Sequence, residues 1–272
     1  MTVSSDLSRG RDGRPSRARP FGACLRRLGA AMALAIVAAA GSAAPAGAVQ
    51  TFSGEALMNG VKIGHDACLK IERTVWVEAF GEGFCVRYYV GGNPRGRSAA
   101  VFFPGDAFGF DERGKIAPDP GYLTQAPEFV DAAVRVWSQR LNVPVIFFGR
   151  LGMHGSSGWH GDRRTALEVA VTRAALDAIK AREGVTGYHL VGQSGGGILV
   201  AAALAARSDV GCAMIGSAPL SFPVFAKTYG ITIRKDGRRA HYDAVPDAAA
   251  IAARTKGMPP EAPGRAVGRG CS

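Results

Sequence analysis

The chain has 272 residues, of which 47% are hydrophobic and 20% charged, and its formal net charge is +11 at pH 7. This composition excludes a disordered or fibrous chain and is sufficient for one domain with a substantial core. Residues 1–48 hold seven arginines against two aspartates, and residues 245–272 hold four basic residues against two acidic ones. The body between them therefore carries only +4, without a basic stripe, so we expect no nucleic-acid partner.

The N-terminus has the three parts of a secretory signal peptide over residues 1–48. An arginine-rich stretch ends at Arg26-Arg27, an apolar run covers residues 28–40, and Ala46-Gly47-Ala48 is a small-residue cleavage site. The apolar run is shorter than the roughly 20 residues that span a bilayer, and an uncleaved anchor is the alternative. We expect an exported protein, periplasmic or secreted, with no stable membrane span once the leader is removed.

Export would permit disulfide bonds. Cys68 and Cys85 flank a predicted hairpin and either form a bridge that contributes roughly 3 kcal/mol or remain two buried thiols. Cys212 lies in an apolar run and is interpreted as a core residue. No spacing of cysteine and histidine indicates a zinc site, and we expect neither a metal nor a cofactor.

The first half of the body begins with strands. Residues 74–80 and 84–90 are predicted to form a hairpin around Gly81-Glu82-Gly83, and residues 98–103 form a third strand that ends at Pro104-Gly105-Asp106. Pro127 then opens a predicted helix. Its expected buried face recurs at every fourth residue: Phe129, Ala133, Trp137 and Leu141.

The second half of the body alternates strands with helices. Strands are predicted over residues 143–148, 187–191 and 210–215, and helices over residues 163–183 and 198–207. Asp162 is the expected N-cap of the first of these helices. The alternation predicts an α/β domain over residues 49–244, with a mostly parallel sheet and helices on both faces.

The run Gly192-Gln193-Ser194-Gly195-Gly196 fits G-x-S-x-G between a predicted strand and a predicted helix. A serine at such a sharp turn projects its hydroxyl above the sheet, and the flanking glycines let strand and helix pass closely. The Gly195 amide opens the helix, where an unpaired N–H can bind a developing oxyanion. A second donor is expected after the third strand, from the amide of Asp106 or Gly105.

Phosphate binding is the main alternative for a glycine loop between a strand and a helix. The glycines at 192–197 do not follow G-x-G-x-x-G, and no Lys-Ser/Thr pair follows to make a P-loop. Position 212, about 20 residues on, holds a cysteine where a dinucleotide site has an acid. The motif therefore favours a nucleophilic serine over a nucleotide site.

With these elements in this order, residues 74–219 resemble the α/β-hydrolase family, in which the nucleophilic serine follows the fifth strand, as Ser194 does here. Residues 150–158 are also similar to the glycine- and serine-rich loop of many exported or peptidase-like members. The resemblance implies a serine hydrolase that cleaves a small acyl ester or a peptide through an acyl-enzyme on Ser194.

The resemblance also implies an acid and a histidine after Ser194, on the loops that follow the seventh and eighth strands. His241 and Asp243 are the candidate base and acid, although a surface turn is the simpler interpretation. Residues 245–272 are predicted to be a disordered or non-native tail, so the final strands would be missing. The alternative function is therefore a catalytically defective, truncated relative with an unpaired sheet edge.

Other polar residues near the motif receive simpler interpretations. We expect His154 and His160, in the loop after the fourth strand, to be solvated at the mouth of the site. His189 lies within a strand and is expected to be packed and hydrogen-bonded. Asp106 is expected to contribute its amide rather than its carboxylate.

Overall fold

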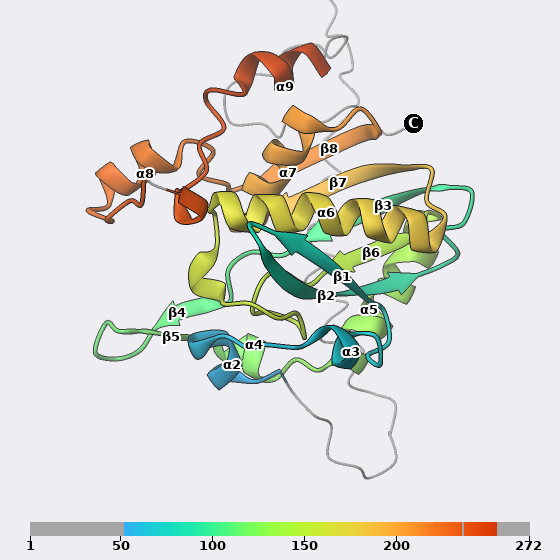
Figure 1. Ribbon diagram of the computed structural model, residues 1–272, viewed down its shortest axis with the longest axis horizontal. Coiled ribbons are helices and arrows are strands. Elements are labelled where there is room, and N and C mark those ends of the chain that lie inside the picture. The colour runs from blue at the N-terminus through green and yellow to red at the C-terminus, as the bar shows by residue number, and fades with distance from the viewer. Residues whose placement is uncertain (1–51, 236, 255–272) are drawn as a thin grey trace, which may run out of the picture.

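The computed structural model describes residues 52–235 and 237–254, so the predicted signal peptide lies outside the described residues. The main sheet has the strand order β1-β2-β6-β3-β7-β8, and β4 and β5 form a separate pair (Figure 1). The strands are β1 (Thr74–Ala79), β2 (Glu82–Gly91), β3 (Ser98–Phe103), β4 (Phe108–Phe110), β5 (Ile116–Pro118), β6 (Val145–Phe148), β7 (Gly187–Gln193) and β8 (Val210–Gly216).

The described helices lie before, between and after these strands. They are α2 (Gly54–Asn59), α3 (His65–Cys68), α4 (Pro120–Leu123), α5 (Pro127–Leu141), α6 (Ala166–Glu183), α7 (Gly195–Ala206), α8 (Phe222–Thr228) and α9 (Ala248–Arg254), with 3₁₀ turns η2 (His160–Asp162) and η3 (Gly237–Arg239). The predicted α/β class is confirmed, because four adjacent strands, β6, β3, β7 and β8, run parallel and only the N-terminal hairpin adds antiparallel pairing.

Helices cover both faces of the sheet. Successive residues of β3 point to opposite faces: Val101 belongs to one buried cluster with α6 and α7, and Phe102 packs against a second cluster with α5. In Figure 1, α6 and α7 lie on one side of the strands and α5 on the other. The parallel strands are therefore enclosed, as their continuous apolar sequences require.

The hairpin turn is tighter than predicted. Phe80 and Gly81 are the two turn residues, and both have positive φ values, 51° and 75°. Such a pair is typical of a type I′ turn, whose twist matches that of the flanking strands. Pairing resumes at Glu82, which the sequence had placed in the turn.

The buried face of α5 is displaced from the predicted one. Trp137 is buried as expected, but Phe129 and Leu141 are 47% and 41% exposed, and Val130 and Val134 are buried instead. A spacing of four exceeds the 3.6 residues of one helical turn, so such a series drifts around the helix. The neighbouring positions 130 and 134 lie closer to the centre of the sheet-facing stripe.

The prediction that Asp162 caps α6 is wrong. The helix begins at Ala166, and its N-cap is Thr165, whose hydroxyl accepts a hydrogen bond from the Glu168 amide at 3.4 Å. Asp162 lies in η2, and its carboxylate binds arginine side chains. Because the Thr165 hydroxyl caps α6, the Asp162 carboxylate is not needed as a cap and can form these ion pairs.

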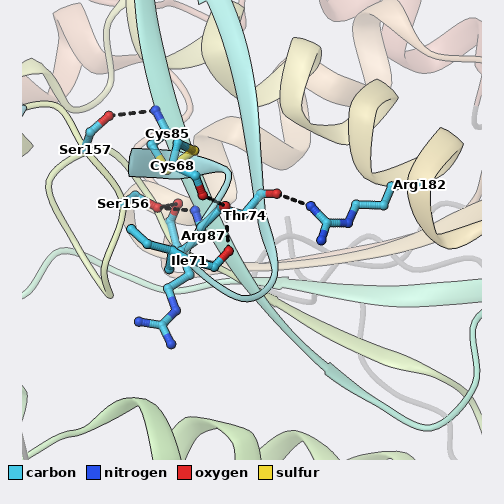
Figure 2. The surroundings of a disulfide bond; sticks show 9 residues. Cys68, Ile71, Thr74, Cys85, Arg87, Ser156, Ser157 and Arg182 are labelled. Carbon is cyan, nitrogen blue, oxygen red and sulfur yellow. Dashed lines mark hydrogen bonds between the residues drawn. A yellow bond between two sulfur atoms is a disulfide. The ribbon is translucent and has the colours of Figure 1, made fainter. Parts of the chain in front are cut away.

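Cys68 and Cys85 form the disulfide bond that the sequence left open, with Cα atoms 5.5 Å apart. Figure 2 shows Ser156 and Ser157 pointing toward the same stretch of β2. The Ser157 hydroxyl accepts from the Cys85 amide at 2.8 Å, and the Ser156 hydroxyl accepts from the Arg87 amide at 2.9 Å. The glycine- and serine-rich loop thus binds the part of β2 that β6 does not pair with.

The chain after β8 is partly ordered where a tail was predicted. Helix α9 lies within the segment 245–272 and packs beside α7 (Figure 1). The rest of the segment predicted to be a tail, residues 255–272, lies outside the described residues. Cys212 on β8 is half-buried rather than fully buried. Within residues 52–235 and 237–254, no helix is long and apolar enough to cross a bilayer.

Candidate active site

Ser194 occupies a strained turn at the carboxyl edge of the parallel strands. It lies between β7 and α7 with φ of 51° and ψ of −121°, a region that costs a residue with a Cβ on the order of 1–3 kcal/mol. Its amide donates to the Gly216 carbonyl, at the end of β8, at 2.8 Å. The strain that the G-x-S-x-G pattern predicted is thus present at the serine itself.

Glycines permit the close packing around this turn. A Cβ on Gly192 would lie 2.5 Å from the Gly196 carbonyl oxygen, and a Cβ on Gly196 would lie 2.2 Å from the Phe103 carbonyl oxygen. Neither position can hold a larger residue without a shift of the backbone. Strand β7, helix α7 and the end of β3 therefore meet only because these two residues have no side chain.

The loop after β3 lies beside the serine, as predicted. A Cβ on Gly105 would lie 3.4 Å from the Ser194 Cβ. Gly195 is the first residue of α7, where the amides lack a carbonyl partner within the helix and the helix dipole is positive. Ser194 thus lies close to the residues whose amides are proposed to bind an oxyanion: Gly195, and Gly105 or Asp106. Gln193 is exposed at the end of β7.

A fully buried arginine holds this loop in place. Arg150, which follows β6, donates from Nη1 to the Pro104 carbonyl at 3.1 Å and to Asp106 Oδ1 at 2.9 Å. Its Nε and Nη2 donate to the two carboxylate oxygens of Glu168 at 2.7 and 3.0 Å. The bidentate pair connects the loop after β3 to helix α6.

The side chain of Asp106 is the centre of an ion cluster, which corrects the expectation that only its amide matters. Its carboxylate binds Arg150 and Arg164, and Arg163 Nε lies 3.2 Å away. Burial alone would raise the pKa of Asp106, but the guanidinium groups of Arg150 and Arg164 hold it well below its usual range. A Cβ on Gly195 would meet Asp106 Oδ1 at 2.5 Å, so a permanent negative charge lies at the start of α7.

Sequence reasoning missed Arg150 and Arg164 as parts of this cluster. Arg150 follows β6 and Asp106 follows β3, and these two strands are parallel neighbours. Opposite charges directly after two adjacent parallel strands were therefore a usable signal once the strand order was known. No pattern along the chain pointed to Arg164.

The two loop histidines are buried rather than solvated, contrary to expectation. His154 lies among the rings of Phe52, Tyr122 and Phe147, and burial lowers its pKa to about 3. His160 stacks on Phe108, and burial together with Arg150 lowers its pKa well below the usual value. Both rings are therefore neutral around pH 7.

His241 and Asp243 do not form a base–acid pair. The His241 ring packs against Phe222, and its Nδ1 accepts from the Arg234 amide at 2.9 Å. An accepting Nδ1 places the proton of the neutral ring on Nε2, which then cannot accept a proton from serine. Asp243 instead accepts from the Val245 amide at 3.1 Å.

Ser194 has no hydrogen-bonded base among the described residues. Among the described residues, no hydrogen bond joins the Ser194 hydroxyl to a histidine, and no group of three or more potential metal ligands occurs. The described site therefore contains a strained serine and candidate oxyanion donors.

No protein-family model and no curated protein matches the chain. Among solved structures it is similar to Est1E from Butyrivibrio proteoclasticus with bound ferulic acid, at 16% identity, over 65% of this chain and 70% of that one, with a TM-score of 0.41. An esterase of Pyrococcus furiosus is 10% identical over 71% and 72% of the two chains, with a TM-score of 0.43.

A proline iminopeptidase of Mycobacterium smegmatis is 18% identical over 58% of this chain and 48% of its own, with a TM-score of 0.35. The fold itself is read from the sheet. Its fifth strand in chain order, β7, leads directly into Ser194, and four parallel strands follow an antiparallel hairpin. The chain has the α/β-hydrolase fold.

Proposed function

We propose that the protein is an exported serine hydrolase that cleaves an acyl ester or a peptide bond through an acyl-enzyme on Ser194. The observation that carries this proposal is the backbone of Ser194, a non-glycine residue at φ 51° between a buried strand and a buried helix. Strain of this kind persists only where the surrounding structure holds it in place, and it is common at catalytic residues. No structural need of the turn explains a serine there, since glycine would relieve the strain.

In the proposed reaction the Ser194 oxygen attacks the carbonyl carbon of the substrate. The hydroxyl proton is transferred to the leaving alcohol or amine as its bond to the carbonyl carbon breaks, and water later releases the acid from the serine ester. The amides of Gly195 and of Gly105 or Asp106 would donate to the oxyanion of each tetrahedral intermediate. Arg150 would act as a positioning residue, because it fixes the Pro104 carbonyl and the Asp106 carboxylate.

His241 is the histidine to test as the base. It lies in the segment after β8, and its ring is only partly buried, unlike those of His154 and His160. Release of the hydrogen bond between the Arg234 amide and Nδ1 would free the ring to turn and present an unprotonated nitrogen. If His241→Ala leaves the rate of Ser194 acylation unchanged, His241 is not the base.

Two features support export. The first 48 residues have the pattern of a cleavable leader, and the Cys68–Cys85 disulfide is of a kind that persists in oxidising compartments. Expression of the full chain in a bacterium, followed by fractionation and N-terminal sequencing, should yield a form outside the cytoplasm that begins at Val49. Retention of residues 1–48 on the mature protein would contradict leader cleavage.

A fluorophosphonate probe tests the nucleophile directly. We expect covalent labelling of the wild type and its loss in Ser194→Ala. Ser217→Ala is a matched control, because Ser217 also has φ of 51° and directly follows the neighbouring strand β8. Labelling that survives in Ser194→Ala, or a folded wild type that neither labels nor hydrolyses 4-nitrophenyl esters, would overturn the proposal and favour a catalytically defective relative.

A further inference from the structure

A positively charged hollow lies in the segment between α8 and α9. It has a volume of about 430 Å³ and is lined by Ile233, Arg234, Lys235 and Arg239. Three of these four residues are cations. The hollow therefore has a net positive charge if its three cations have fewer than three acidic partners among the described residues.

Two of the cations share one carboxylate. Arg239 Nε lies 2.7 Å from Asp162 Oδ1 and Arg234 Nη1 lies 3.5 Å from it, and the Asp162 side chain is only 8% exposed. Lys235 is exposed and forms no ion pair with a described residue, unlike the two arginines. Three cations thus face one acid, and they would still outnumber the acids if Asp236, which lies outside the described residues, were added.

Contacts link the hollow to the serine by two routes. Asp162 directly precedes Arg163 and Arg164, which both contact the carboxylate of Asp106 beside Gly195. By the second route, the Arg234 amide binds His241, whose ring packs on Phe222.

The second route returns to the same cluster, because the Arg164 guanidinium lies over the Phe222 ring at 5.3 Å from its centroid. Arg164 is therefore common to both routes, and through Asp106 it reaches the first residue of α7. A chain of contacts through Asp162, His241 and Arg164 therefore connects the hollow to the start of α7.

We propose that this hollow binds a carboxylate of the substrate, so that the preferred substrates are esters or amides whose acyl chain ends in a carboxylate. This inference rests on the proposed function of Ser194. Asp162 holds the two arginines in place before substrate arrives, and Lys235 supplies a charge that no described acid neutralises. Fixed guanidinium groups suit a planar carboxylate, which accepts two hydrogen bonds at once.

The test compares 4-nitrophenyl monoesters of dicarboxylic acids, from succinate to suberate, with the corresponding neutral methyl esters. For at least one chain length we expect kcat/KM to favour the anionic substrate by about tenfold, and we expect this preference to fall as salt is added. Lys235→Gln should reduce the preference by about threefold and Lys235→Glu by more. Lys70→Gln, an exposed lysine beyond α3, is the control and should leave the preference unchanged.

Two results separate this inference from the proposed function. If Ser194 labels and neutral esters are hydrolysed, but the wild type shows no anionic preference or Lys235→Glu retains it, the carboxylate site is wrong and the serine hydrolase stands. Binding of glutarate to Ser194→Ala protein, measured by calorimetry, tests the hollow without catalysis. We expect Lys235→Glu to weaken that binding and Lys70→Gln to leave it intact, and no binding at all would overturn the inference.

Discussion

The two halves of the candidate site are held by different amounts of buried structure. Around Ser194, Arg150 is fully buried and the glycines at 192 and 196 are in direct backbone contact with their neighbours. After β8, by contrast, the chain exposes large apolar side chains, such as Val224 at 64% and Tyr229 at 67%. The difference indicates that Ser194 and the proposed oxyanion donors are preorganised, whereas the segment after β8 leaves more apolar surface exposed.

This contrast has a consequence for catalysis. A rigid nucleophile is useful only when a base reaches it in the correct geometry. In the described structure the base candidate is bound to the Arg234 amide instead. Substitutions in the first half should therefore mainly change stability, and substitutions after β8 should change stability little.

The largest expected effect comes from Arg150→Met, which would leave Glu168 buried without a guanidinium partner and Asp106 with Arg163 and Arg164 alone. Loss of one member of a buried ionic cluster costs about 3–5 kcal/mol, and we expect a loss of this size in urea denaturation. Arg97→Met is the control, because Arg97 makes one exposed hydrogen bond, to the Asn142 carbonyl. A cost below about 1 kcal/mol for Arg150→Met would show that the first half is not held by this cluster.

Gly196→Ala tests the close approach of α7 to β3. The added methyl would lie 2.2 Å from the Phe103 carbonyl oxygen, so the helix must move away from the strand. Overpacking of this kind costs about 1–3 kcal/mol, and fluorophosphonate labelling should slow because Ser194 moves with the helix. Gly109→Ala, where a Cβ meets nothing within 4 Å, should be close to neutral in both measurements. Equal effects of the two substitutions would contradict the close packing at Gly196.

Acid should destabilise the first half through its buried histidines. Burial holds the pKa of His154 at about 3 in the folded chain, while the unfolded chain has a value near 6.5. Because the folded pKa is the lower one, stability is full above about pH 6.5 and falls below it, by about 1.4 kcal/mol per pH unit. His160, whose pKa is also lowered, acts in the same direction.

Urea midpoints at pH 7.5 and pH 5 check this expectation. His154 has φ of 50°, which asparagine tolerates, so His154→Asn removes the titrating group without a new backbone strain. The variant should lose less stability between the two pH values than the wild type, by about 2 kcal/mol. His65→Asn is the exposed control. An unchanged difference in His154→Asn would show that the ring is protonated in the folded state.

The same contrast governs what could be predicted from the sequence. Ser194 and the glycines at 192 and 196 act through their immediate neighbours, and a motif five residues long contains that information. The role of Arg150 depends on Asp106 and Glu168, which strand order alone brings to it. Burial of His154 was likewise invisible, because the rings around it come from three separate segments.

After β8 the local patterns were weak for a physical reason. A segment with few buried side chains needs no apolar periodicity, so the pattern that reveals sheet-covering helices is absent. Helix α9 has no buried residue, and its half-buried Ile251 packs against the main core. The prediction of a disordered tail from residue 245 followed from that lack of periodicity and did not anticipate this helix.

The smallest expected effect is that of Val224→Ser, in the exposed part of α8. The side chain is 64% exposed, so its removal from the surface should change the free energy of unfolding by no more than about 0.5 kcal/mol. Val134→Ser is the matched substitution in α5, where the side chain is fully buried, and it should cost several times more because a hydroxyl replaces a packed methyl. Denaturation of both variants, with labelling of Ser194, measures the contrast directly. A large loss of stability in Val224→Ser would contradict the exposed position of this side chain. The segment after β8 would then be held about as firmly as the part of the molecule around Ser194.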